Sequence, residues 1–94
     1  MAVGDAVVNN SSVATTAFLA IQPGAGVEWL VHHIFHEAEV EIYWYDGSND
    51  IKIAAPAGFN YETMQARVTD SIYLRVKNIN GSTKRIGYNA VITK

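Results

Sequence analysis

The sequence has no cysteine among its 94 residues. Disulfide bonds, thiolate metal ligands and thiol nucleophiles are therefore excluded. Charged residues are scarce, at 17%, and the formal net charge is only −2. The Lys and Arg residues are dispersed apart from the pair Lys84-Arg85, whereas duplex binding depends on clustered cations that neutralise several phosphates. Nucleic acid is therefore not an expected partner.

Long apolar runs are also missing. No stretch approaches the roughly 18 apolar residues of a membrane-spanning helix, and the first five residues lack the basic and apolar segments of a signal peptide. We expect a chain that is made and folded in the cytoplasm, without a membrane partner. Hydrophobic residues make up 49% of the sequence, which indicates one compact folded domain at this length.

Alternation of apolar and polar residues, with turn residues between the alternating segments, recurs along the chain. Residues 13–21, 27–35, 39–45, 51–53, 72–77 and 85–92 show this period of two, which is typical of β-strands. In residues 59–69 we expect a loop followed by a strand. No segment has a convincing helical period. The sequence therefore predicts an all-β protein, a small antiparallel β-sandwich or jelly roll of about seven or eight short strands.

Turn residues predict how these strands connect. Pro23-Gly24 should end the first strand, because proline presets φ at one turn position and glycine accepts a positive φ at the next. We expect a hairpin about residues 36–38, between the strands at 27–35 and 39–45. Asn80-Gly81 is the strongest hairpin signal, since a type I′ turn needs a positive φ at both central residues.

The first dozen residues are small and polar, and they show little periodicity. Such terminal segments are often mobile until a partner orders them. The sequence therefore predicts an extended N-terminal arm at residues 1–12 and a single β domain at residues 13–94. Val3, Val7 and Val8 would become buried only when the arm lies across a neighbouring subunit.

Three histidines, His32, His33 and His36, form the cluster that most invites a chemical interpretation. On a helix, His32 and His36 would share a face and could ligate one metal ion. Their β-branched and aromatic neighbours favour a strand, where residues four apart lie about 13 Å from each other, too far to share an ion. We therefore predict no metal or other cofactor, and place these histidines in the structure or at an interface, where a histidine titrates near neutral pH. A metal with further ligands from another strand or subunit is the alternative.

Carboxylates and phenols alternate with apolar residues in 39–45, where Glu39, Glu41, Tyr43 and Tyr45 would share the outward face. This face could bind a carbohydrate together with the loop at 46–50, or Glu39 and Glu41, about 7 Å apart, could form an acid and base pair. We favour a solvated strand face whose charges prevent unwanted pairing. The 46–50 loop lacks the spacing and closing glutamate of a calcium loop. Because the familiar catalytic motifs are also missing, we expect no enzyme.

Aromatic residues are numerous for so small a core, with two tryptophans, three phenylalanines and five tyrosines. Phe59, Tyr61 and Tyr73 are further large aromatic residues beside the tyrosines named above. Aromatic residues are enriched in protein–protein interfaces. We therefore expect a homo-oligomer, most simply a trimer, that uses residues 27–45. The predicted interface residues are Val3, Val7, Val8, His32, His36, Tyr43 and Tyr45.

Four segments give the chain a family resemblance: Gln-Pro-Gly-Ala-Gly-Val-Glu-Trp at 22–29, Ile-Tyr-Trp-Tyr-Asp-Gly at 42–47, Ile-Tyr-Leu-Arg-Val-Lys-Asn at 72–78 and Ile-Gly-Tyr-Asn-Ala-Val at 86–91. With them, residues 17–94 resemble the small head-decoration (cement) or accessory proteins of tailed bacteriophages. These are β-sandwich or jelly-roll proteins, and many bind as trimers where major capsid subunits meet. The resemblance implies a non-enzymatic virion protein that stabilises neighbouring major capsid subunits or binds another virion protein. A carbohydrate- or receptor-binding module is the alternative.

Overall fold

The computed structural model describes residues 2–56 and 60–94, with the side chains of residues 60–62 left out. Within this part of the chain the regular elements are all strands, which confirms the all-β prediction. None of the described residues belongs to a helix long and apolar enough to cross a membrane. The eight strands are β1 (Ala6–Val13), β2 (Phe18–Ile21), β3 (Trp29–His36), β4 (Val40–Tyr45), β5 (Asp50–Ala54), β6 (Asn60–Val68), β7 (Tyr73–Asn78) and β8 (Lys84–Ile92).

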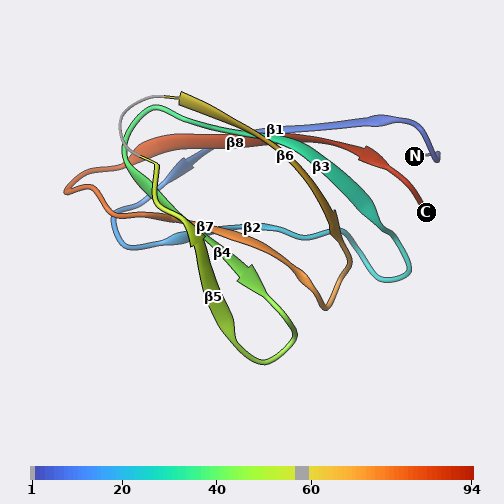
Figure 1. Cartoon of the computed structure of the whole chain (residues 1–94). Helices are drawn as coiled ribbons and strands as arrows, with labels where there is room; N and C mark the ends of the chain where they lie inside the picture. Colours follow the sequence, from blue (N-terminus) through green and yellow to red (C-terminus); the bar gives the residue numbers. More distant parts are fainter. Residues whose placement is uncertain (1, 57–59) are drawn as a thin grey trace.

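The strands form two four-stranded antiparallel sheets that pack face to face (Figure 1). Sheet A has the order β1-β8-β3-β6 and sheet B the order β2-β7-β4-β5. The pairs β1 with β8, β2 with β7, β3 with β6 and β4 with β5 are therefore nested within one another. This nesting of eight strands in two sheets is the topology of a jelly roll.

The core lies between the two sheets and consists of aliphatic side chains at alternate strand positions. Val40 and Ile42 on β4, and Leu74 and Val76 on β7, are fully buried, as the period of two predicts. On β8 the inward set is Ile86, Tyr88, Ala90 and Ile92, all at most 6% exposed.

The predicted N-terminal arm is wrong as a structural unit, because most of it is strand β1. This strand pairs with β8 without interruption from Ala6↔Val91 to Val13↔Lys84. Val7 and Val13 are 8% and 5% exposed and belong to the core. Polar composition misled the prediction, since an edge strand needs few inward apolar residues once a neighbour supplies its backbone hydrogen bonds.

Both predicted hairpins are wrong as well. The residues at 36–38 lead from β3 in sheet A to β4 in sheet B, and Asn80-Gly81 lies between β7 in sheet B and β8 in sheet A. Gly81 is not among the described glycines with a positive φ. In the described chain, β4 and β5 are the only consecutive strands that pair with each other. The expected loop before residue 69 is also shorter than predicted, because β6 already begins at Asn60, while Phe59 lies outside the described residues.

Asn78, at the end of β7, holds the loops at one end of the sandwich together. Its side chain is fully buried, and its Nδ2 donates to the carbonyl oxygens of Val13, at 2.8 Å, and Ser82, at 2.9 Å. Its Oδ1 accepts from the backbone N–H of Asn80 at 2.9 Å. One side chain thus connects the end of β1 with the connection between β7 and β8.

Candidate functional site

The histidine cluster is divided between the two faces of sheet A. His36 is 5% exposed, and its Nδ1 lies 2.9 Å from the carbonyl oxygen of Ala38. The half-buried His33 has its Nδ1 3.1 Å from Oδ1 of Asn89. His32 sits where the register of β3 shifts against both neighbouring strands, and its ring centroid is 6.4 Å from that of His33. His36 is therefore not available to a partner in the folded domain, which corrects its assignment to the interface. Among the described residues, no group of three or more His, Asp or Glu residues is arranged to hold a metal ion.

The outer face of sheet B carries the tyrosines that the sequence analysis singled out. The hydroxyl of Tyr43 donates to Oε1 of Glu41 at 2.7 Å, and Nζ of Lys52 lies 3.1 Å from Oε2 of the same carboxylate. These two hydrogen bonds, that from Tyr43 first, lower the pKa of Glu41. The bond to Glu41 raises the pKa of Tyr43. Both groups thus have a fixed place on β4.

Phe18 of β2 lies at the centre of a second set of contacts on this face. The guanidinium carbon of Arg75 lies 3.9 Å from the centroid of the Phe18 ring, and the Tyr43 ring meets it edge-on at 5.6 Å. Nη1 of Arg75 also lies 2.6 Å from Oδ2 of Asp50. Farther along the face, the rings of Tyr45 and Tyr73 are 5.1 Å apart. We call Phe18, Tyr43, Tyr45, Tyr73 and Arg75 the Phe18 patch.

Sequence reasoning missed Phe18 and Arg75, although both alternate with residues that face the core in their segments. Phe18 alternates with Leu19 and Arg75 with Leu74 and Val76, which places both side chains on an outward face. What the sequence did not show is that β2 and β7 are neighbours in one sheet. Their juxtaposition depends on a long-range pairing.

The proposed carboxylate pair and the calcium loop gain no support from these contacts. Glu41 already binds Tyr43 and Lys52 on an open sheet face. In the loop, Oδ1 of Asp46 accepts from the backbone N–H groups of Asn49, at 2.8 Å, and Ser48, at 3.0 Å, and these hydrogen bonds, that from Asn49 first, lower the pKa of Asp46. This carboxylate closes the turn between β4 and β5.

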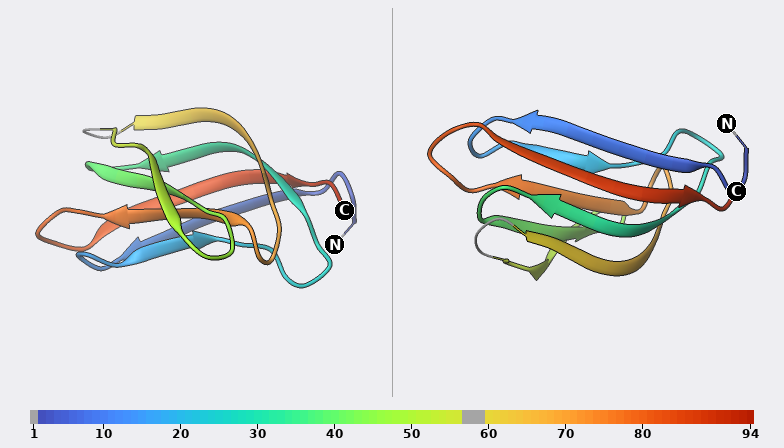
Figure 2. Two further views of the ribbon diagram at one scale, coloured as in Figure 1. Left: turned by 60° about the horizontal axis from the view of Figure 1, so that its bottom comes forward. Right: turned by 90° about the horizontal axis from the view of Figure 1, so that it is seen from above.

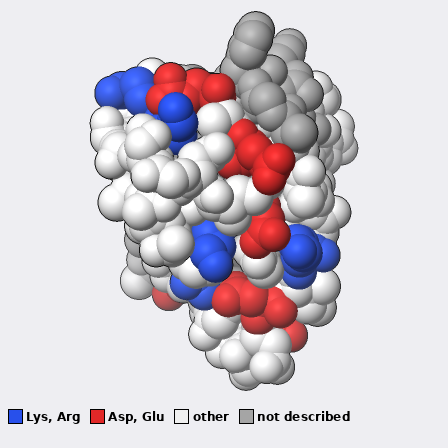
Figure 3. All heavy atoms as spheres, turned by 90° about the vertical axis from the view of Figure 1, so that its left-hand side faces the viewer, with Lys and Arg blue, Asp and Glu red and all other residues white. Residues whose placement is uncertain are grey.

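Charges on the surface are mixed in sign. Figure 3 looks at the end of the sandwich opposite the two marked chain ends, and Lys or Arg side chains there lie interspersed with Asp and Glu. The described ion pairs include Lys52 with Glu41 and Arg75 with Asp50. Such a surface does not form the single-sign field that attracts a polyanion.

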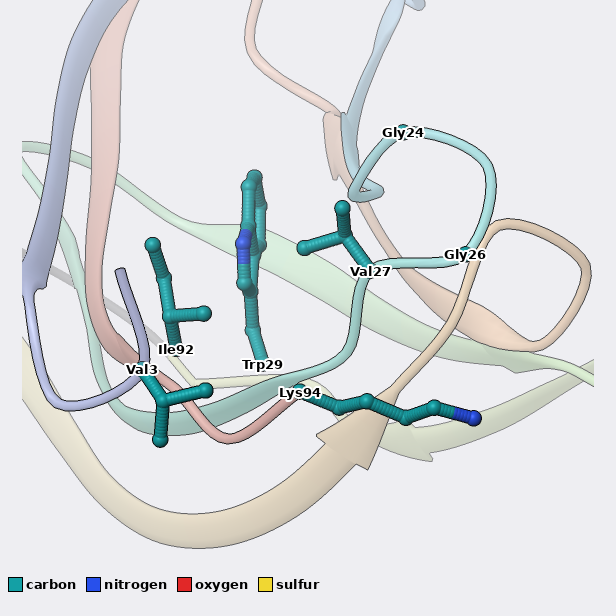
Figure 4. A pocket seen from close by; sticks show the side chains of 7 residues that line it. All are labelled: Val3, Gly24, Gly26, Val27, Trp29, Ile92 and Lys94. Atoms are coloured by element: carbon teal, nitrogen blue, oxygen red, sulfur yellow. The ribbon is translucent and has the colours of Figure 1, made fainter. Parts of the chain in front are cut away.

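A hollow of about 450 Å³ lies at the other end of the sandwich (Figure 4). The turn between β2 and β3 forms one wall: Val27 N–H donates to Gly24 O at 3.1 Å, and the positive φ of 76° falls at Gly26 instead of the predicted Gly24. The indole of Trp29 stands in the hollow between Val27 and Ile92. The lining residues are Val3, Gly24, Gly26, Val27, Trp29, Ile92 and Lys94.

The three valines predicted to contact a partner differ in position. Val3 lines the hollow and is 68% exposed, and Val8 is 69% exposed on β1, so both can contact another molecule. Val7 is buried in the core of its own domain, and its assignment to an interface is wrong.

No protein-family model matches the chain, and no curated protein has a significantly similar sequence, so the function proposed for the chain depends on the geometry of these surfaces.

Proposed function

We propose that this protein is a non-enzymatic structural protein of a viral particle, and that it attaches to a major capsid protein or another virion protein through the Phe18 patch. The observation that carries the proposal is the packing of Arg75 on Phe18 with Tyr43 against the ring edge. Aromatic residues and arginine are enriched in protein interfaces and dominate their hot spots. The patch combines both on one sheet face.

The patch is also held in place before any partner binds. Asp50 fixes the guanidinium of Arg75, and Glu41 fixes the hydroxyl of Tyr43. Binding loses less side-chain entropy when the contacting groups are already ordered. Jelly rolls are frequent in viral capsids, and this supports the proposal at the level of the fold.

The test is co-sedimentation of the full chain with capsids of the virus that encodes it. Phe18→Ala and Tyr45→Ala should each weaken attachment about tenfold or more, equivalent to ~1.4 kcal/mol. Ile72→Ala is the matched control, because Ile72 is 40% exposed and lies outside the patch. Absence of the wild-type chain from the particles, or equal binding of all variants, would contradict the proposal.

A carbohydrate-binding module is the second candidate, and the hollow beside Trp29 favours it. An indole face stacks well on a sugar ring, and Gly24 and Gly26 let a ligand approach the backbone closely. Binding on a glycan array would support this candidate if Val3→Trp, which fills the hollow, abolishes it while Tyr45→Ala leaves it unchanged.

A further inference from the structure

Strand β1 differs from the other three edge strands because it is long, carries no charge of its own and has no irregular register. Edge strands commonly avoid unwanted partners by being short, by carrying charges or by irregular register. Strand β2 has four residues, β5 carries Asp50 and Lys52, β6 carries Arg67, and both β5 and β6 have register shifts. Strand β1 has eight residues, no charge and an unbroken register, and it lies at one edge of sheet A, beside β8 (Figure 2).

The hydrogen bonds near β1 show which of its backbone groups point to the open edge. Ile92 N–H donates to Asp5 O at 3.0 Å, so Asp5 turns its carbonyl towards β8. The direction alternates along a strand, and Val7, Asn9, Ser11 and Val13 therefore also turn towards β8. Arg85 O, which accepts from Glu37 N–H on the other side of β8, agrees with this pattern.

The backbone groups of Ala6, Val8, Asn10 and Ser12 consequently turn away from the sheet. All four residues are exposed. Arg85 contacts one of these backbone groups, with its Nη2 3.3 Å from Asn10 O, and this exposed side chain would turn aside or share the carbonyl when a partner strand binds. The edge thus presents donors and acceptors in a regular row.

We propose that β1 pairs antiparallel with β1 of a second copy of this chain, about a two-fold axis at Asn9. Ala6 of one copy then faces Ser12 of the other, and Val8 faces Asn10. This register uses all of the outward-turned residues, and each facing pair exchanges two backbone hydrogen bonds. Sheet A becomes continuous across the dimer, and the two copies present the same surface to each other, as a two-fold interface requires.

Charge favours a second copy in this orientation. Ser12 and Val13 lie beside Arg85 and Lys84 of β8, whereas Asp5 precedes the other end of β1. Antiparallel pairing brings Asp5 of each copy next to the Lys84 end of the other. A parallel arrangement would instead align like charges. The Phe18 patch lies on the other sheet, so this dimer does not depend on the proposed attachment face.

Sedimentation and amide exchange of the full chain test the pairing. We expect a monomer–dimer equilibrium, with the amides of Val8, Asn10 and Ser12 protected from exchange only at concentrations where the dimer forms. The amides of Asn9 and Ser11 bond to β8 and should be protected at every concentration. A monomer at all concentrations up to about 1 mM, or a trimer, overturns the proposal.

Two variants act on the edge and leave the backbone hydrogen bonds of the monomer in place, although Asn10→Lys also loses the side-chain hydrogen bond that Arg85 Nε donates to Asn10 Oδ1 at 3.0 Å. Val8→Pro deletes an N–H that points to the open edge, and Asn10→Lys adds an edge charge. Each should raise the dimer Kd about tenfold or more, while the control Ile53→Lys, at a 52% exposed position of β5, should not. If Val8→Pro does not fold, Asn10→Lys decides alone. A dimer that the folded edge variants leave intact contradicts the pairing.

Discussion

The ring of Phe35 on β3 covers the backbone of Gly87 on β8, its direct partner in sheet A. A methyl group at position 87 would overlap both this ring and the carbonyl oxygen of Asn9. The close approach is possible only because Gly87 has no side chain. Gly87 therefore allows the Phe35 ring to pack directly against the backbone of β8.

Substitution of Gly87 by alanine should destabilise the fold. Overpacking of this kind costs about 1–3 kcal/mol, and urea unfolding will measure the loss. Gly81→Ala is the matched control, because a Cβ there meets nothing within 4 Å and the φ is not positive. Equal stability of the two variants would contradict the contact between Phe35 and position 87.

Adjacent valines on β1 distinguish a packed strand from a mobile arm. Val7→Ala removes buried methyl groups and should lower the free energy of unfolding by about 1–2 kcal/mol. Val8→Ala changes an exposed side chain and should stay within about 0.5 kcal/mol of the wild type. Urea unfolding at low protein concentration compares the variants as monomers. If Val7→Ala and Val8→Ala had the same free energy of unfolding, residues 1–12 would be a mobile arm and not a packed strand.

Loss of the Asn78 side chain should be among the most damaging polar substitutions. Asn78→Ala removes the hydrogen bonds donated to the carbonyls of Val13 and Ser82 and the acceptor of the Asn80 N–H, and each polar group left without a partner costs about 1–3 kcal/mol. Asn78→Asp has the same shape but places a carboxylate against the carbonyl oxygens of Val13 and Ser82. We expect thermal unfolding at neutral pH to show both variants clearly destabilised. A stable Asn78→Asp protein would mean that the two donated hydrogen bonds contribute little.

The carboxylate of Glu41 should make stability depend on pH. Tyr43 and Lys52 hold its pKa below the ordinary 4.5 in the folded state. Such a group stabilises the fold fully above pH 4.5, and this contribution disappears as the pH falls through the lowered pKa. Carboxyl NMR titration should give a pKa below 4.5 in the wild type and one closer to 4.5 in Tyr43→Phe. The same pKa in both proteins would show that the phenol is not the main cause.

The local alternation of side chains could be predicted from the sequence, whereas strand partners could not. Val40, Ile42 and Leu74 are buried as the period of two requires, because the inward and outward directions depend only on neighbouring positions. The segment at 36–38 and Asn80-Gly81 were expected to join paired strands, but both connect the two sheets. A turn signal shows that the chain reverses, and it does not show which strand will lie alongside.

In the candidate sites, too, the direction of a side chain could be predicted and the neighbouring strands could not. Tyr43 and Tyr45 were expected on an outward face, and they lie there. Phe18 and Arg75 join them only because β2, β7 and β4 are successive strands of sheet B. The hollow beside Trp29 was not predicted, because it depends on the position of the turn between β2 and β3 relative to the end of β8.

The pairing of β1 with β8 also constrains how the chain folds. These strands stand at opposite ends of the described sequence, and the chain ends lie side by side in Figure 1. Topologies dominated by such distant pairs have a high contact order and fold slowly, because loop entropy is lost before the contacts form. Among the described strands, β4 and β5 are the only consecutive pair, so they are the strands that we expect to pair early in folding. We expect pulsed amide labelling during refolding to protect β4 and β5 first and β1 last, so that the pairing of β1 with β8 completes sheet A as the final step.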